Sequence, residues 1–541
     1  RGSGNVSPSP PGEAAGPGRP AALQWFDVDM PTVVVGLAAL SAADVVAVAR
    51  DGAPVRLSDG AVAAMTASRA HIEALADDPR PAYGISTGFG ALATRHIPAP
   101  MRAQLQRSLI RSHAASSGPP IEREVVRALM VLRLRTLATG RTGVQPATAA
   151  TLAALLNAAI TPVIGEFGSL GCSGDLAPLS HVALALMGEG EVGDARDRLR
   201  PAADALAEAG IAPIELAAKE GLALINGTDG MLGMLVLACH DLDAMLRAAD
   251  LAAAMSVEAL LGTDRVFAAD LQALRPQPGQ QEAAANMRAL LADSPIMASH
   301  RGPDCPLVQD AYSLRCAPQV AGAARDTLRH ARAIAAYELD SIIDNPVVLA
   351  DGRVESNGNF HGAPVGYVLD FLAIAAADVA GMSERRTDRM LDVHRSNGLP
   401  PFLAADPGVD SGHMIAQYTQ AAIVSELKRL AVPASVDSIP TSAMQEDHVS
   451  MGWSAARKLR RAVDGLRRVL AVETLTAARA LDLRAPLSPG PATAAAVASL
   501  RTVVPTVGPD RWLAPEIEAT VQALQDGSLL AAAESVTGPL A

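Results

Sequence analysis

Five long stretches with helical hydrophobic periodicity follow Pro201, and they constrain the fold of this chain more than any other feature. They are the ranges 231–261, 317–343, 363–391, 413–431 and 447–483. Apolar residues recur in each at the spacing of an amphipathic helix, and several stretches exceed the length of an ordinary globular helix. Helices of that length need partners along their whole extent, as in a bundle. The sequence therefore predicts a mainly all-α protein, with loops at the breaks near Pro346, Pro400 and Pro440.

Composition and charge agree with a helical protein that acts on a small molecule. Apolar residues make up 49% of the chain but aromatic residues only 3%, so that Ala, Leu and Val must fill the core, and these residues suit closely packed helices. The net charge of −12 does not favour binding to nucleic acid or to an anionic membrane, both of which are negatively charged. Charged residues also interrupt the apolar stretches before they reach the length of a membrane span.

The chain divides into three regions by its local patterns. Residues 1–28 are rich in Gly, Pro and Ser without the apolar run of a signal peptide, which predicts a disordered tail. Residues 29–200 alternate short helical patterns with glycine-rich turns and are expected to form an irregular N-terminal domain. Residues 201–541 are expected to form the long-helix bundle and a C-terminal helical region. The four cysteines are too sparse for a disulfide-built fold, which favours a reducing cytoplasm.

Several motif matches are rejected on their context. Residues 84–88 fit the Gly-x-Ser-x-Gly form of a hydrolase nucleophile, but that motif needs a strand before it and a helix after it, and this segment has the pattern of a loop. Residues 188–193 fit a dinucleotide fingerprint by spacing, yet two glutamates would face the pyrophosphate. The histidines form no His-x-x-x-His pair and no cluster with zinc spacing, so no metal site is predicted.

The most informative segment is 168–181, which reads Gly-Ser-Leu-Gly-Cys-Ser-Gly-Asp-Leu-Ala-Pro-Leu-Ser-His. It resembles the signature of the aromatic amino acid ammonia-lyases, in which Ala-Ser-Gly cyclises to 4-methylidene-imidazol-5-one. The resemblance implies that Cys172, Ser173 and Gly174 form this group autocatalytically, with no external cofactor. The amide nitrogen of Gly174, unhindered by a side chain, can attack the carbonyl of residue 172, and loss of the Ser173 hydroxyl as water leaves an electrophilic methylene. Cys172 replaces the usual Ala, and only its carbonyl enters the ring, so that the thiol should be tolerated.

The resemblance extends over nearly all of the chain after Leu37 and includes five further segments, 83–90, 225–228, 309–316, 357–361 and 444–448. It implies an aspartase/fumarase-like central bundle and a homo-oligomer, expected to be a tetramer, whose active sites are shared between subunits. The expected reaction is a non-oxidative elimination of ammonia from an amino acid.

The resemblance also implies roles for individual residues. Tyr83 is expected to be the general base that removes a β-proton, which requires the site to stabilise its phenolate. Arg315 can grip the substrate carboxylate with two hydrogen bonds, and Tyr312, three residues before it, would share its helix face and could donate to the prosthetic ring or aid its formation. Asn226 and Gln309 are neutral groups that could orient the substrate or polarise the ring carbonyl.

Three residues bear on the substrate. The four-residue spacing of Met101, Leu105, Leu109 and His113 places His113 at the end of an apolar stripe that is expected to turn inward, where an imidazole suits a polar ring. Segment 112–115 also matches the version of this helix in the histidine-acting members.

Glu446 can accept a hydrogen bond from a substrate imidazole, although it could instead be a favourable acid at the start of a helix beginning near Asp447. Phe360 is expected to line the pocket. L-histidine is therefore the expected substrate and trans-urocanate the product, as in the first step of histidine degradation.

Two alternatives stay open from the sequence. The first is a tyrosine or phenylalanine ammonia-lyase, or an aminomutase that returns ammonia to the β-carbon, because these would share the same electrophile. The second is a catalytically silent helical scaffold in which residues 172–174 never cyclise.

Overall fold

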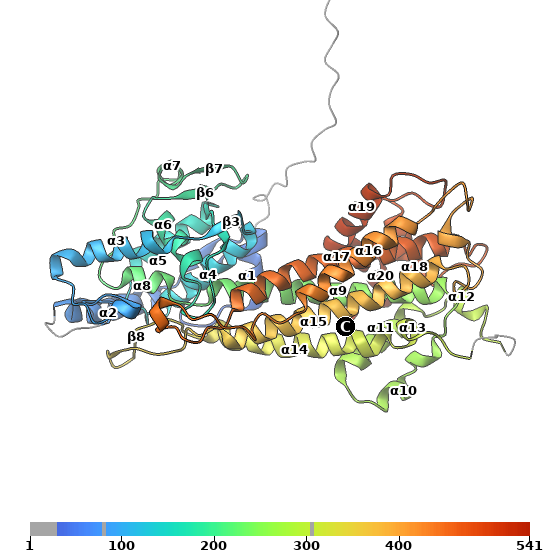
Figure 1. Cartoon of the computed structure of the whole chain (residues 1–541), viewed down its shortest axis with the longest axis horizontal. Helices are drawn as coiled ribbons and strands as arrows, with labels where there is room; N and C mark the ends of the chain where they lie inside the picture. The colour runs from blue at the N-terminus through green and yellow to red at the C-terminus, as the bar shows by residue number, and fades with distance from the viewer. Residues whose placement is uncertain (1–29, 78–82, 303–307) are drawn as a thin grey trace, which may run out of the picture.

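The computed structural model describes residues 30–77, 83–302 and 308–541, so that the predicted tail 1–28 lies outside the described residues. The molecule is elongated, with an N-terminal lobe at one end and a bundle of long helices running to the other (Figure 1). The central helices are α9 (Asp229–Ala259), α14 (Ala317–Asp340), α15 (Ala363–Leu391), α16 (Met414–Leu430) and α17 (Gly452–Asp482). The prediction of a mainly all-α protein with a long bundle is confirmed.

Helices also dominate the N-terminal lobe. They are α1 (Ala42–Val46), α2 (Asp59–Asp77), α3 (Arg102–His113), α4 (Arg123–Ala138), α5 (Pro146–Asn157), α6 (Leu176–Leu186), α7 (Ala202–Glu208) and α8 (Glu220–Ile225). The predicted boundary at residue 200 stays a proposal. Beyond it, α7 still packs on the β-strands of the lobe and α8 packs on α3 and α6, so that the lobe extends to the start of α9.

Short strands complete the lobe and one loop of the bundle. β1 (Val33–Val35) pairs in parallel with β2 (Val55–Leu57), and β3 (Ser117–Pro120) pairs antiparallel with β5 (Gly165–Phe167). β4 (Thr161–Pro162), β6 (Glu191–Gly193) and β7 (Leu199–Pro201) form an antiparallel sheet, while β8 (Val347–Val348) and β9 (Val354–Glu355) form a hairpin. The rejected dinucleotide match 188–193 thus ends in a strand of a hairpin and opens no helix, as that motif would require.

Shorter helices cover the far end of the bundle. They are α10 (Ala269–Ala273), α11 (Pro278–Leu290), α12 (Pro295–Ala298), α13 (Tyr312–Arg315), α18 (Pro491–Leu500), α19 (Ala514–Gln525) and α20 (Ser528–Thr537). Proline lies in the first turn of several helices, including α14 and α15, where its missing N–H has no intrahelical acceptor to lose.

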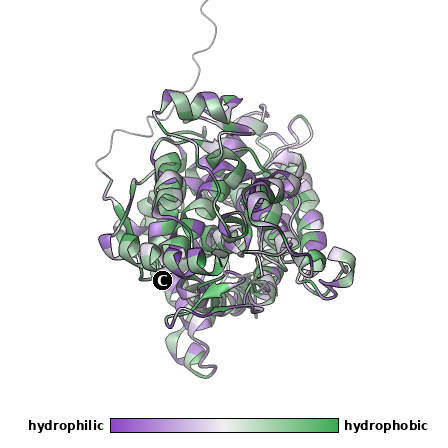
Figure 2. Ribbon diagram, turned by 90° about the vertical axis from the view of Figure 1, so that its left-hand side faces the viewer, coloured by the Kyte–Doolittle hydropathy of each residue, from purple (hydrophilic) through white to green (hydrophobic). Residues whose placement is uncertain are grey.

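The core is one continuous cluster of mostly aliphatic residues, which runs through the lobe and the bundle. Viewed along the long axis, hydrophobic and hydrophilic residues alternate along the helices (Figure 2). The segment 220–259 and α15 are long and apolar enough to cross a membrane, but the apolar window of the first is fully buried here, which is the environment of a core helix.

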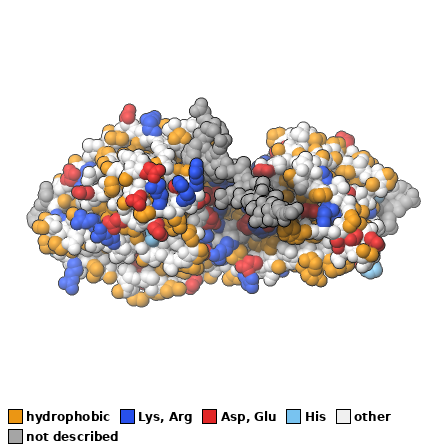
Figure 3. Space-filling view, turned by 90° about the horizontal axis from the view of Figure 1, so that it is seen from above, with side chains coloured by type: hydrophobic (Ala, Val, Ile, Leu, Met, Phe, Trp, Pro, Cys, Tyr) orange, Lys and Arg blue, Asp and Glu red, His pale blue; other side chains and the backbone are white. Residues whose placement is uncertain are grey.

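Buried charges also tie the central helices together. Arg386 on α15 pairs with Glu473 on α17 at 2.8 Å, and Ser256 on α9 donates to the same carboxylate at 2.7 Å. On the surface seen from above, acidic and basic side chains are interspersed (Figure 3).

Candidate functional site

The segment 168–174 is a tight loop between β5 and α6, and it is held against the turn that precedes α9. Gly174 has a φ of +86°, and a Cβ there would lie 2.4 Å from the backbone nitrogen of Gly227, so that only glycine fits. The next residue, Asp175, donates its backbone N–H to the Gly227 carbonyl at 2.7 Å. Backbone packing at this point therefore requires the glycine that the predicted cyclisation also requires.

Asp175 anchors this loop to the first turn of α9. Its carboxylate accepts hydrogen bonds from the backbone N–H groups of Gly230 and Met231 and from the hydroxyl of Ser169. Burial raises the pKa of Asp175 to about 7 in spite of these donors. Asp175 was not among the predicted site residues, although its place directly after Cys-Ser-Gly was the available signal.

Glu446 lies directly at the reacting serine. The Ser173 hydroxyl donates to Glu446 Oε1 at 2.7 Å, and the Thr441 hydroxyl donates to Oε2 at 2.6 Å. Glu446 is held by a β-bridge to Thr441, and α17 begins only at Gly452. The expected helix start near Asp447 is therefore wrong, because Met451 adopts a left-handed φ of 52° just before the helix. Glu446 is therefore not a helix-terminal acid, and its carboxylate contacts Ser173 and Thr441 instead.

The Cys172 thiol lies beside the same carboxylate, with Sγ 3.6 Å from Glu446 Oε2. Burial, reinforced by the charge of Glu446, raises the pKa of Cys172 to about 11. The thiol is therefore protonated at neutral pH, and a protonated thiol is neither a nucleophile nor a strong hydrogen-bond donor.

We predict that Cys172→Ala keeps turnover within about threefold of the parent, because the variant loses only a weak S–H donor. Steady-state kinetics on purified protein would check this, with prosthetic-group content measured by mass. A folded but inactive variant would show that the thiol has a chemical role.

His113 ends α3 and is half-buried, close enough to Glu446 for the carboxylate charge to act on its ring. Burial lowers its pKa, and the imidazole is therefore mainly neutral at pH 7. Its Nδ1 lies 3.0 Å from the Ser112 hydroxyl. The expected inward stripe is only partly correct: Leu109 is buried, but Met101 is 47% exposed, because it precedes the helix at the surface end of α3.

Tyr83 occupies a turn, and the segment 83–90 is a loop as predicted. Its phenolic oxygen accepts a hydrogen bond of 3.2 Å from the backbone N–H of Gly90, a donor of the kind that a phenolate needs. The same loop reaches η6 (Ser442–Met444), which lies next to Glu446 in sequence. Tyr83 therefore belongs to the same end of the molecule as Ser173.

Asn226 and Phe360 also lie at this end. Asn226 is 4% exposed and directly precedes Gly227, the residue packed on Gly174. Phe360 is half-buried and lies two residues before Gly362, whose N–H donates to the carbonyl of Gly171 in the prosthetic-group loop at 3.0 Å. The chain thus brings eight of the predicted residues together: Cys172, Ser173 and Gly174 lie in the loop itself, and Tyr83, His113, Asn226, Phe360 and Glu446 lie around it.

The remaining three predicted residues, Gln309, Tyr312 and Arg315, lie at the opposite end of the bundle. The neighbouring Asp310 accepts a hydrogen bond of 2.7 Å from the backbone of Thr263, just beyond the C-terminus of α9, whereas Asn226 precedes its N-terminus. A helix of the 31 residues of α9 is about 45 Å long, and Figure 1 shows α13 and α8 at opposite ends accordingly. One chain therefore cannot bring the two groups of predicted residues together.

Two residues of the distal group lie next to each other. Tyr312 and Arg315 share the single turn of α13, and the Arg315 guanidinium lies 4.7 Å from the centre of the Tyr312 ring. Tyr312 is 69% exposed, and Arg315 Nε is buried without a hydrogen-bond partner among the described residues. An exposed aromatic ring beside a guanidinium whose Nε has no partner is suited to completing a site elsewhere.

Known proteins that resemble this chain are amino acid lyases and aminomutases. The family model described as aromatic amino acid lyase matches residues 40–502. A histidine ammonia-lyase of Streptomyces avermitilis is 65% identical over 513 residues, which cover 95% of this chain and 100% of the relative. A solved tyrosine aminomutase from Streptomyces globisporus has a TM-score of 0.89 at 39% identity, covering 94% of this chain and 100% of that one. A solved histidine ammonia-lyase from Trypanosoma cruzi has a TM-score of 0.86 at 38% identity, covering 94% and 96%.

The fold and the site thus define a carbon–nitrogen lyase. The chain belongs to the aromatic amino acid lyase family.

Proposed function

We propose that this chain eliminates ammonia from L-histidine to give trans-urocanate in the cytoplasm. The observation that carries the proposal is the contact between Ser173 and Glu446, whose charge acts on the half-buried imidazole of His113. A carboxylate at the reacting serine, with an imidazole within reach of its charge, can recognise the ring N–H of a histidine substrate, which a phenyl ring does not have. Relatives named histidine ammonia-lyase at 65% and 64% identity support the same substrate.

The residues present fit a methylidene-imidazolone formed from Cys172, Ser173 and Gly174. Gly174 lacks the side chain that would hinder attack by its amide nitrogen, and it packs so closely on Gly227 that the loop is held in a tight turn. Once formed, the group would supply an electrophilic carbon that converts the amine of the substrate into a better leaving group.

The side chains of the chain itself would then divide the work. Tyr83 takes the β-proton, assisted by the hydrogen bond from Gly90, while Glu446 accepts a hydrogen bond from the substrate imidazole. Asn226 offers its Oδ1 to a donor of the substrate, and Phe360 closes one wall. Arg315, supplied by another subunit, holds the carboxylate with a fork of two hydrogen bonds, with Gln309 and Tyr312 beside it.

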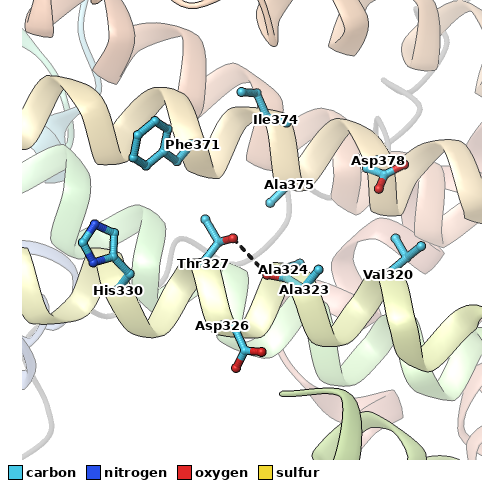
Figure 4. A pocket seen from close by; sticks show the side chains of 10 residues that line it. All are labelled: Val320, Ala323, Ala324, Asp326, Thr327, His330, Phe371, Ile374, Ala375 and Asp378. Atoms are coloured by element: carbon cyan, nitrogen blue, oxygen red, sulfur yellow. Dashed lines mark hydrogen bonds between the residues drawn. The ribbon is translucent and has the colours of Figure 1, made fainter. Parts of the chain in front are cut away.

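We propose a homotetramer with shared sites, because the two groups of residues can meet only if α13 of one copy approaches the prosthetic-group loop of another. The bundle surface supports this assembly. A groove of about 510 Å³ lies between α14 and α15, and its floor includes Phe371, Ile374 and His330 (Figure 4). Phe371 and Ile374 are each 46% exposed, and large apolar side chains exposed on neighbouring helices are typical of subunit interfaces.

A subunit-mixing experiment tests the shared site. Ser173→Ala and Arg315→Ala should each be inactive alone, but they damage different halves of the site. Assembled together in equal amounts, they should leave both halves intact in about a quarter of the sites, and the mixture should regain activity in that proportion.

The matched control mixes Ser173→Ala with Glu446→Ala, which damage the same half and should give no rescue. A mixture of Ser173→Ala and Arg315→Ala that stays as inactive as its components would show that each site is built within one chain.

Substrate choice is tested by replacing His113 with Leu while Glu446 stays intact. The pocket loses a polar partner for imidazole and gains apolar surface, so that the ratio of kcat/KM for histidine to that for phenylalanine should fall about tenfold. Prosthetic-group content is checked by mass in parent and variant. An unchanged ratio would make His113 a structural residue.

A tyrosine-directed reaction is the second candidate, because the fold matches a tyrosine aminomutase as closely as it matches a histidine ammonia-lyase. Product analysis with histidine, tyrosine and phenylalanine separates the candidates, since an aminomutase would yield a β-amino acid. We expect urocanate from histidine to exceed all other products.

A further inference from the structure

A buried ion pair that the mechanism does not use lies behind Asn226. Lys219, at the start of α8, donates to Asp344 Oδ2 at 2.5 Å and to the carbonyl of Thr142 at 2.8 Å. Both charged side chains are completely buried. Burying two charges is unfavourable unless their geometry serves the structure or the site, and an apolar pair of similar size is often at least as stable. The position of this pair therefore calls for a function.

The pair connects to the active site through one residue. Asp344 Oδ1 accepts a hydrogen bond of 2.9 Å from the backbone N–H of Asn345, and the Asn345 carbonyl accepts one of 3.0 Å from Asn226 Nδ2. A carbonyl oxygen can only accept, so the carboxamide of Asn226 must turn its nitrogen toward Asn345. Its Oδ1 then remains a buried acceptor without a partner in the described part of the chain.

An unsatisfied buried acceptor is unfavourable in a free protein and becomes favourable when a ligand donates to it. The backbone of Asn226 is fixed as well, since Arg133 donates to its carbonyl at 3.4 Å and pairs with Asp229. The orientation of the Asn226 side chain is thus determined by Asn345 and Arg133, which do not belong to the proposed substrate pocket.

Asn345 also holds the segment that carries Phe360. Its Oδ1 accepts hydrogen bonds from the Ser356 hydroxyl at 2.9 Å and from the Asn357 backbone at 3.0 Å. The Asn357 side chain in turn donates to the Asp344 carbonyl at 2.9 Å. Asp344 and Asn345 therefore hold two separate segments of the proposed site, the one with Asn226 and the one that leads to Phe360.

We propose that the Lys219–Asp344 ion pair is a positioning device that acts through Asn345, orienting the carboxamide of Asn226 so that its Oδ1 accepts a hydrogen bond from the bound amino acid. The identity of that amino acid rests on the proposed function, whereas the orientation of Asn226 does not. Lys219 and Asp344 are thus positioning residues rather than catalytic ones.

The test replaces the pair by apolar residues of similar size, Lys219→Met with Asp344→Leu, which avoids leaving one buried charge alone. A crystal structure of the variant should show that Asn226 Nδ2 no longer contacts Asn345. The KM for L-histidine should rise about tenfold or more, as expected for one lost buried hydrogen bond, while kcat changes less. Intact mass should show that the prosthetic group still forms.

Non-additivity distinguishes positioning from general stability. In an Asn226→Ala background the pair replacement should raise KM by less than about twofold further, because the group that it positions is already absent. The matched control is another buried ion pair, Arg325 with Asp250, replaced by Met and Leu. This control should change thermal stability but neither KM nor the position of Asn226.

A milder variant, Lys219→Met with Asp344→Asn, keeps an acceptor for the Asn345 N–H and can be measured if the Leu variant does not fold. It should raise KM about threefold or more, again only when Asn226 is present. An unmoved Asn226 in the crystal structure, or a rise in KM that is the same with and without the Asn226 side chain, would overturn the proposal. A parent protein that does not act on histidine would refute the proposed function, and the position of Asn226 would still decide this inference.

Discussion

Ser173→Ala is expected to lower turnover of L-histidine by about a thousandfold or more while the protein folds and assembles normally. Alanine has no hydroxyl to lose as water, so the electrophilic carbon cannot form. The mass of the purified variant should accordingly lack the loss of about 36 Da that two eliminated waters give. The variant loses the hydrogen bond from this hydroxyl to Glu446, and the packing of Gly174 on Gly227 stays intact.

The matched control for this variant is Ser180→Ala in the same signature. The Ser180 hydroxyl donates to the carbonyl of Leu176 within α6 and is buried, so its loss removes a helix hydrogen bond without touching Glu446. Ser180→Ala should keep near-normal turnover. Substantial turnover by Ser173→Ala, with its mass unchanged by dehydration, would refute the assignment of the electrophile.

Tyr83→Phe should lower kcat by about a hundredfold to ten-thousandfold, the range that general acid–base groups contribute. The variant should keep the prosthetic group, because Tyr83 contacts its own loop through Gly90 and has no described hydrogen bond to residues 172–174. Histidine binding, measured as protection of the variant against thermal unfolding, should persist.

Tyr418→Phe provides the control, since Tyr418 lies on α16 with 60% of its surface exposed. It should leave turnover unchanged. If Tyr83→Phe turned over at a near-normal rate, the proton acceptor would have to be another group, and Glu446 would be the first to examine.

The sequence predicted the helices well where periodicity and a helix-starting proline coincide. α15 spans the predicted range 363–391, with Pro364 in its first turn. α17 was predicted to start five residues too early, because the acidic residues at 446 and 447 resemble the first turn of a helix. A β-bridge between Thr441 and Glu446 overrides this pattern, and the Glu446 carboxylate contacts Ser173, a residue that no local window contains.

The sequence identified the residues of the candidate site, but it did not predict which of them lie close together. The contact between Ser173 and Glu446 joins positions separated by 273 residues, and Lys219 meets Asp344 across 125 residues. No periodicity or spacing encodes such pairs, so the contacts that link Lys219 and Asp344 to Asn226 could not be predicted. The separation of Asn226 and Arg315 could not be predicted either, because it arises from the fold, in which the two residues lie near opposite ends of α9.

The self-formed prosthetic group and the elimination of ammonia from histidine are tested together on a single preparation of the purified protein. Its intact mass is measured first, and L-histidine is then added while urocanate absorbance and released ammonia are followed together. The expected results are a mass about 36 Da below that of the unmodified chain and equal molar amounts of urocanate and ammonia. An unmodified mass, or a dehydrated protein that releases no ammonia from histidine, would contradict the proposed function.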